Sequence, residues 1–327
     1  MKNMNILFAG SPQISAEILK NIIKNNSINV IGVITKPDKP QKRGNKTLES
    51  NVSLIAKANN IDLFKPTDLN DDEFTKRIIN MEIDCLVVIA YGKKIPDWLL
   101  ECSKLLSINL HFSLLPKYRG ASPIQSALIN NDKKTGVTFI KLNSELDSGE
   151  IIKSYKCAID FLDKKSTLEK KLCDLSIEKF PEVFDLIKSN KYKLKKQNNN
   201  KSSYCKKIVK DDSMIDFSKG SIEIYNRYRA FEGWPGTNFL FSDILIKIHK
   251  LHISDTKSSD KPGTIYKFSS DGIYVNTIDK VIVITNVASK CGFTSQYEDL
   301  QTIWEKYQEK GLVVIRVPSS SFNQEFQ

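Results

Sequence analysis

The 327-residue sequence has no apolar run close to the roughly 20 residues that a membrane-spanning helix needs. The first apolar stretch stops at Gly10-Ser11-Pro12, which is typical of a first strand rather than of a secretory signal. Hydrophobic residues make up 40% of the chain and charged residues 27%, the balance of an ordinary soluble protein. We therefore expect a cytoplasmic protein with no membrane partner.

Cysteine and histidine are scarce. The six cysteines contain no Cys-x-x-Cys pair, and there are only three histidines. This spacing excludes the common zinc motifs and gives no disulfide framework, so we expect chemistry without a metal. The Gly-x-Gly-x-x-Gly motif is also missing, which argues against a dinucleotide site.

Acidic residues are too few to balance the basic ones, since 38 Asp and Glu face 49 Lys and Arg and leave a formal charge of +11. Such an excess favours a polyanionic partner such as nucleic acid. It is equally compatible with a genome rich in A and T, which encodes lysine freely. The distribution of the basic residues along the chain has to decide between these two explanations.

The order of apolar segments predicts the fold class. A strand at 5–9, a tight turn at 10–12 and a helix open the chain, and strands at 29–34 and 84–90 follow with helical segments between them. This alternation is typical of an α/β domain with a Rossmann-like, mainly parallel sheet. A helix at 166–189 completes it, so we assign residues 1–189 to the first domain.

Three polar residues follow predicted strands of this domain. Asn109 and His111 alternate onto one face at the end of a buried strand, and Asp147 lies in a turn after another strand. The carboxyl ends of such strands are where open α/β sheets bind ligands. The three side chains can supply a base, the carboxylate that orients it and an amide donor.

Four motifs carry a resemblance: Asn109-Leu-His111, Ser113-Leu-Leu-Pro116, Arg119-Gly120 and Leu146-Asp147-Ser-Gly149. They resemble the signature of the folate-dependent formyltransferases, and residues 1 to about 284 resemble the branch that formylates methionyl initiator tRNA. The resemblance implies 10-formyltetrahydrofolate as co-substrate, with Asn109, His111 and Asp147 as catalytic residues.

The folate site is expected in two segments. The end of the third strand can sandwich a flat pterin ring, although such an apolar run is also ordinary core. Pro116 ends a strand and should leave backbone groups free for a ligand, and the resemblance implies a folate contact there. The candidate residues are Ile89, Ala90, Tyr91, Gly92, Ser113, Leu114, Leu115 and Pro116.

Basic residues gather in two segments. The loop at 35–46 is broken by Pro and Gly and carries Lys39, Lys42 and Arg43. It can be a plain solvated connection, but the resemblance implies that the matching insertion contacts the tRNA acceptor arm. Residues 190–210 predict an exposed basic linker, in which we expect Lys206 and Lys207 to contact RNA phosphates.

The remaining chain predicts a small β-domain at 211–284. A helix at 221–231 is followed by β segments at 237–241, 244–253, 264–268, 272–276 and 281–284. One helix with several short strands indicates a small β-barrel of OB-like type. The resemblance implies a tRNA-binding role for it.

The C-terminal segment departs from this pattern. Residues 282–325, with Cys291 in Asn-Val-Ala-Ser-Lys-Cys-Gly-Phe-Thr, resemble the N-terminal half of a glutathione peroxidase. The sequence ends before the strands that would complete a thioredoxin-like sheet. We therefore expect residues 285–327 to be an incomplete fragment without peroxidase activity.

The expected function is formyl transfer from 10-formyltetrahydrofolate to the α-amino group of methionyl initiator tRNA, in translation initiation, by a monomer. The same three residues would also serve a formyltransferase that acts on a small amine, such as glycinamide ribonucleotide or an amino sugar. The basic loop, the basic segment and the β-domain favour tRNA. A tRNA-binding protein without catalysis is disfavoured because all three catalytic positions are filled.

Overall fold

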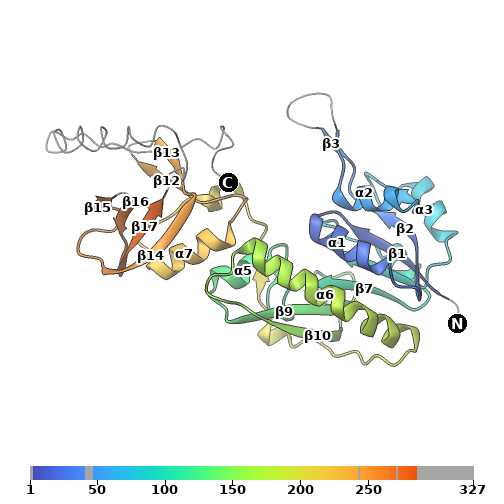
Figure 1. Ribbon diagram of the computed structural model, residues 1–327. Coiled ribbons are helices and arrows are strands. Elements are labelled where there is room, and N and C mark those ends of the chain that lie inside the picture. Colours follow the sequence, from blue (N-terminus) through green and yellow to red (C-terminus); the bar gives the residue numbers. More distant parts are fainter. Residues whose placement is uncertain (1–2, 41–46, 242–243, 270–271, 286–327) are drawn as a thin grey trace. The chain divides into compact units, whose positions relative to one another are not determined.

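The computed structural model describes residues 3–40, 47–241, 244–269 and 272–285 (Figure 1). The chain divides into two compact units between Ile208 and Val209. Among the described residues, no helix combines the length and the apolar character that crossing a bilayer would require. The predicted thioredoxin-like fragment at 285–327 lies outside the described residues, except for Thr285.

The first unit is built on a seven-stranded sheet. Its elements are β1 (Met4–Gly10), α1 (Gln13–Ile22), β2 (Ile28–Ile34), β3 (Lys39–Pro40), β4 (Thr47–Leu48), α2 (Asn51–Ala58), β5 (Leu63–Phe64), α3 (Asp72–Ile79), β6 (Cys85–Ile89), α4 (Asp97–Glu101), β7 (Leu106–His111), β8 (Arg119–Gly120), α5 (Pro123–Ile129), β9 (Lys134–Lys141), β10 (Ile151–Ala158), α6 (Lys165–Lys188) and β11 (Tyr204–Cys205).

The strand order in this sheet is β10-β9-β7-β6-β1-β2-β5. The pairs from β7 to β5 are parallel, whereas β9 runs antiparallel to both β7 and β10. The predicted Rossmann-like, mainly parallel sheet is therefore confirmed. The antiparallel pairing of β9 with β10 follows from the connection between Lys141 and Ile151, which is too short for a parallel crossover.

Helices cover both faces of the sheet, which is why its central strands are continuous apolar runs. All five residues of β6 and all six of β7 are buried. On one face, α1 and α6 lie side by side (Figure 1). On the other, a core cluster joins β1 and β6 to α3 and α4 through Leu7, Leu86, Phe74, Ile78 and Leu99.

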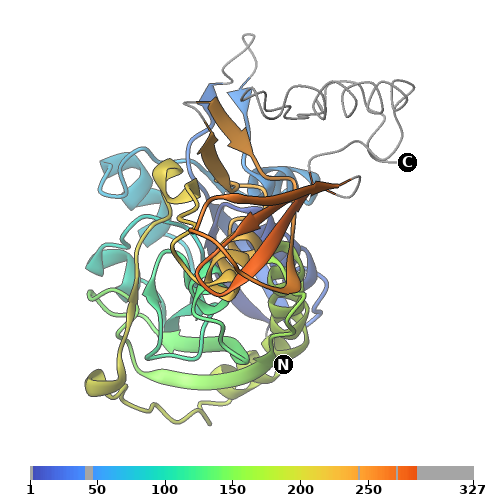
Figure 2. The same ribbon diagram turned by 90° about the vertical axis from the view of Figure 1, so that its left-hand side faces the viewer.

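The second unit contains α7 (Ser221–Ala230) and antiparallel strands, which are seen from another side in Figure 2. These are β12 (Asn238–Phe241), β13 (Ile244–Lys247), β14 (Lys250–Lys257), β15 (Ile265–Ser269), β16 (Gly272–Asn276) and β17 (Lys280–Thr285). They form a two-stranded sheet, β12-β13, and a four-stranded sheet in the order β14-β17-β16-β15. The prediction of a single β segment at 244–253 was wrong, because the chain leaves the two-stranded sheet after Lys247 and enters the four-stranded sheet at Lys250.

The segment predicted as an exposed linker is held against the first unit as far as Ile208. Lys195 exchanges main-chain hydrogen bonds of 2.8 and 2.9 Å with Ile151, and β11 pairs in parallel with β8. Its lysine side chains are nevertheless exposed, including Lys206 and Lys207. We call this segment, residues 190–208, the strap. It is docked on the rest of the first unit and has a basic outer surface, so it is not a free tether.

Candidate active site

Asn109 and His111 lie in β7, between β6 and β9. Asn109 pairs with Val88 on one side and with Ile140 on the other, so the strand is fixed from both edges. Both side chains are buried, Asn109 to 9% exposure and His111 to 5%. Because residues two apart in a strand point the same way, the two polar groups face one region.

Asp147 enters this region from the turn between β9 and β10. Its Oδ1 accepts from Asn109 Nδ2 at 3.4 Å, and its Oδ2 lies 3.6 Å from His111 Nδ1. The main-chain N–H of Gly120 also donates to Oδ2, at 2.8 Å. The structure therefore brings together the three residues that the sequence singles out, with the carboxylate between the amide and the ring.

The other ring nitrogen of His111 determines how the imidazole is held. Nε2 lies 2.8 Å from the main-chain oxygen of Tyr118. A carbonyl oxygen only accepts, so Nε2 carries a proton and Nδ1 is the nitrogen that faces Asp147. Two partners from different segments fix the ring's orientation, as a group that takes part in proton transfer requires.

The first candidate segment for folate, residues 89–92, has two side chains that are buried in the core. Ile89 is fully buried, and Tyr91 is 1% exposed and belongs to the core cluster next to α3 and α4. Burial raises the pKa of the Tyr91 hydroxyl to about 12. Ala90 and Gly92 turn outward with positive φ values of 46° and 73°. The accessible part of this segment is therefore the backbone turn.

The second candidate segment uses much of its backbone internally. Thr138 Oγ1 donates to Ser113 O at 2.7 Å and accepts from Leu115 N at 3.2 Å. Leu114 O accepts from Lys117 N, and Pro116 O accepts from Ser203 N. The expectation that this backbone is free for a ligand was wrong for these four groups, because the turn closes on β9 and on the strap.

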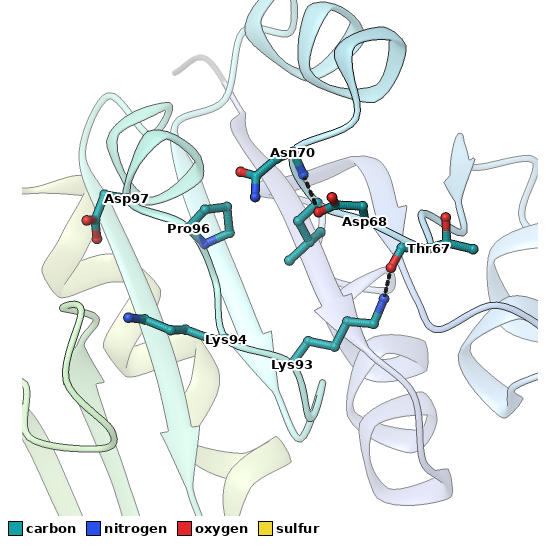
Figure 3. A pocket seen from close by; sticks show the side chains of 8 residues that line it. Thr67, Asp68, Asn70, Lys93, Lys94, Pro96 and Asp97 are labelled. Atoms are coloured by element: carbon teal, nitrogen blue, oxygen red, sulfur yellow. Dashed lines mark hydrogen bonds between the residues drawn. The ribbon is translucent and has the colours of Figure 1, made fainter.

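A cavity of about 420 Å³ opens just after Gly92 (Figure 3). It is lined by Thr67, Asp68, Leu69, Asn70, Lys93, Lys94, Pro96 and Asp97. The side chain of Lys93 lies along one wall, and its Nζ donates to Thr67 O at 2.7 Å. The main-chain N–H of Asn70 donates to Asp68 Oδ1. Asn109, His111 and Asp147 are not among its lining residues, so this polar cavity does not contain the three central side chains.

The basic loop rises from a short hairpin, β3 paired with β4. Lys65 Nζ lies 2.7 Å from Asp38 Oδ1 and 3.5 Å from Glu49 Oε2, and these two acids flank the hairpin. Lys65 thus forms ion pairs with the residues on either side of the hairpin and connects the two ends of the loop. Lys42 and Arg43 lie outside the described residues, and only the backbone of Lys39 is described.

No cluster of three or more His, Cys, Asp or Glu side chains able to hold a metal ion occurs in the described part of the chain. The described cysteines, 85, 102, 157, 173 and 205, are free thiols. Burial raises the pKa of Cys85 and Cys173, the latter to about 11, which makes them unreactive core residues at neutral pH.

Comparison with known protein families identifies the family of the chain. The formyl transferase family matches residues 2–184, and its C-terminal domain matches residues 207–301. The chain belongs to the formyl transferase family. The C-terminal match extends beyond the boundary at 284 that the sequence predicted.

Two similar relatives are methionyl-tRNA formyltransferases. The chain is 38% identical to a methionyl-tRNA formyltransferase of Clostridioides difficile over 284 residues, which covers 87% of this chain and 92% of that protein. It is 36% identical to the methionyl-tRNA formyltransferase of Thermotoga maritima, over 84% of this chain and 88% of that one.

Solved structures extend the likeness to other formyltransferases. The sugar 3N-formyltransferase WlaRD, solved with dTDP and 5-N-formyl-THF, has a TM-score of 0.66 and 25% identity, covering 89% of this chain and all of that one. An N-formyltransferase from Helicobacter canadensis has a TM-score of 0.64, 24% identity, and coverage of 86% and 99%; this likeness concerns the fold alone.

Proposed function

We propose that the protein transfers the formyl group of 10-formyltetrahydrofolate to the α-amino group of methionine on initiator tRNA. The observation that carries the proposal is the 38% identity to a methionyl-tRNA formyltransferase over 87% of the chain. The contacts among Asn109, His111 and Asp147 support it, because they place an amide, a ring and a carboxylate together at the end of β7.

Each of the three residues has a role that its position supports. The free amine attacks the formyl carbon, the bond from that carbon to N10 of the folate breaks, and the amine proton ends on the departing nitrogen. Asn109 donates to the developing oxyanion. His111 assists by proton transfer or by stabilising the same oxyanion, and Asp147 holds its ring.

The charged substrate would meet exposed lysines. We assign RNA contact to Lys39, Lys42 and Arg43 in the hairpin loop, and to Lys206 and Lys207 in the strap. The exposure of Lys206 and Lys207 just beyond β11 supports this assignment. The folate is assigned to residues 89–92 and 113–116, where the turn at Ala90–Gly92 offers the more accessible backbone.

The domain roles form part of the same proposal. Residues 1–189 are the catalytic domain, 190–210 the basic connection, and 211–284 an OB-like tRNA-binding domain. The helix α7 and six antiparallel strands of the second unit support the last assignment. We further propose a cytoplasmic monomer, and a thioredoxin-like fragment at 285–327.

The second candidate function is formylation of a small amine, such as glycinamide ribonucleotide or an amino sugar. It is favoured by the likeness in structure to WlaRD, a sugar 3N-formyltransferase. A small substrate leaves the strap lysines without a role, and the identity to methionyl-tRNA formyltransferases is higher than that to WlaRD, 38% against 25%, which is why we place it second.

One assay separates the two candidates. The purified protein is supplied with 10-formyltetrahydrofolate and, in parallel, with methionyl initiator tRNA, with glycinamide ribonucleotide and with a dTDP-linked amino sugar. We expect turnover with the tRNA alone. Faster turnover of either small amine would replace the proposed substrate, and no turnover with any acceptor would remove the enzymatic assignment.

A further inference from the structure

The turn that carries Asp147 is strained and has to be held from outside. Asp147 has φ +48°, in the left-handed region that costs a non-glycine residue free energy. The turn is also tight, because a Cβ at Gly149 would lie 1.8 Å from Lys141 O. The carboxylate faces Asn109 and His111 only while this backbone conformation persists.

Gln197 supplies an external hold. Its Nε2 donates to the main-chain oxygens of Asp147 and Gly149, both at 2.8 Å. These two bonds use both amide protons and fix the two sides of the turn. Gln197 lies 50 residues after Asp147, in the strap.

Arg119 orients the carboxamide of Gln197. Its Nε and Nη2 donate to Gln197 Oε1 at 3.0 and 2.8 Å, and Nη2 also donates to Asn199 Oδ1 at 2.8 Å. A guanidinium only donates and a carbonyl only accepts, so the amide has one orientation that satisfies every partner. Arg119 is 3% exposed and belongs to β8, which pairs with β11 of the strap.

We propose that Gln197 is a positioning residue for the transfer reaction: it connects the buried Arg119 to the turn of Asp147 and so keeps the carboxylate against Asn109 and His111. The inference rests on the proposed catalytic role of Asp147. It gives the strap a second task besides presenting lysines, since the segment that leads to the C-terminal unit also completes the site.

The test separates holding the turn from anchoring the strap. In Gln197→Glu the acceptor for Arg119 is kept and gains charge, whereas both donors to the turn are lost and a carboxylate meets two carbonyl oxygens. Gln197→Leu removes donors and acceptor together. Asn199→Ala is the matched control. It removes one hydrogen bond between Arg119 and the strap, and it leaves both bonds from Gln197 to the turn in place.

We expect both Gln197 variants to lose roughly 10- to 100-fold in kcat, since a displacement of about 1 Å costs about 100-fold. The KM for 10-formyltetrahydrofolate should stay within about twofold. The melting temperature should fall less in Gln197→Glu, which keeps the bond to Arg119, than in Gln197→Leu, which loses every bond of the amide. In protein labelled with ¹⁵N-histidine, the ring signals of His111 should shift in Gln197→Glu and remain in place in Asn199→Ala.

Other outcomes overturn the inference. Near-normal kcat in Gln197→Glu, or an equal loss in Asn199→Ala, would reduce Gln197 to a structural anchor. Asp147→Asn is measured alongside to keep the two proposals distinguishable. If Asp147→Asn is inactive and Gln197→Glu is active, only the role of Gln197 fails; if Asp147→Asn is active, the catalytic assignment fails.

Discussion

Two aspartates, one in each unit, accept main-chain hydrogen bonds from distant segments and yet have different neighbours. The carboxylate of Asp147 accepts from Gly120 N and also faces Asn109 and His111. Asp279 accepts from Ser221 N, at the start of α7, and from Lys280 N and Thr277 Oγ1. An aspartate surrounded by amides and hydroxyls is a cap, whereas one that faces an imidazole and a carboxamide belongs to a site.

The histidines repeat this contrast. His111 is buried, with both ring nitrogens near a partner, while His249 and His252 are exposed beside and in the antiparallel strand β14. Burying a polar group costs free energy unless its partners compensate. The first unit buries polar groups at the end of β7, and the second keeps its imidazoles at the surface. Substitutions of these groups in the first unit should therefore lower kcat, and those in the second unit should leave kcat unchanged.

The largest effect should come from β7. Asn109→Ala should lower kcat by roughly 10²- to 10³-fold, because one oxyanion donor is lost, and His111→Ala should abolish measurable transfer. Steady-state kinetics with methionyl initiator tRNA measures both. The control His252→Ala removes an exposed ring and should leave kcat unchanged. Near-normal turnover in Asn109→Ala or His111→Ala, with folate binding intact, would refute the assignment.

Asp147→Asn should be almost as damaging, with a loss of about 100-fold in kcat. An amide can still accept from Gly120 N and hold the ring, but it cannot stabilise positive charge on the imidazole. The control in the same turn is Glu145→Gln, which neutralises an exposed carboxylate two residues away. Equal activities of the two variants would show that a charge at Asp147 is not needed.

Much of this comparison could be predicted from the sequence, because it depends on local pattern. The apolar run through β7 and the alternation of Asn109 and His111 determine a buried strand with two polar groups on one face. Asp147 could be predicted as a third member because it follows another strand of the same sheet.

The rest depends on contacts that leave no periodic pattern. The pairing of β8 with β11 joins strands of two residues each, about 85 positions apart, so neither gives a strand signal. Gln197 is one polar residue within a basic segment, and the sequence alone predicts only solvent around it. Likewise, the core position of Tyr91 results from tertiary packing that a five-residue apolar segment does not specify.

An intermediate effect is expected from the basic loop. Replacing Lys42 and Arg43 with Ala should raise the KM for charged tRNA by about tenfold and reduce the slope of log affinity against log salt by about two. The affinity for folate should not change. Replacing the exposed Lys20 and Lys24 with Ala removes the same charge from another segment. If both double variants lose tRNA affinity equally, the loop has no special role.

A smaller effect, on stability alone, should follow Asp279→Asn. The pKa of the Asp279 carboxyl is lowered. Burial alone would raise this pKa, but hydrogen bonds from Ser221, Thr277 and the amide of Lys280 stabilise the charged form by more. A lowered pKa stabilises the folded state above the ordinary pKa of aspartate, and the gain is lost as the pH falls through the folded value.

We therefore expect Asp279→Asn to lower the free energy of unfolding of the second unit by about 1 kcal/mol at pH 7, as for a lost helix cap. The difference from wild type should shrink on acidification below pH ~4. Urea unfolding at the two pH values measures it, and kcat should be unchanged. A loss of kcat without a loss of stability would remove the contrast with Asp147.

The smallest effect is expected at Cys291, which lies outside the described residues and carries the resemblance to a peroxidase. The match to the C-terminal domain of the formyl transferase family runs to residue 301 and includes Cys291, so we expect this residue to belong to that domain and not to a peroxidase. Cys291→Ser should leave formyl transfer unchanged, and the wild-type protein should show negligible thiol-dependent reduction of peroxide. Peroxide turnover that disappears in Cys291→Ser would instead assign a second activity to the C-terminal segment, separate from the three residues around β7.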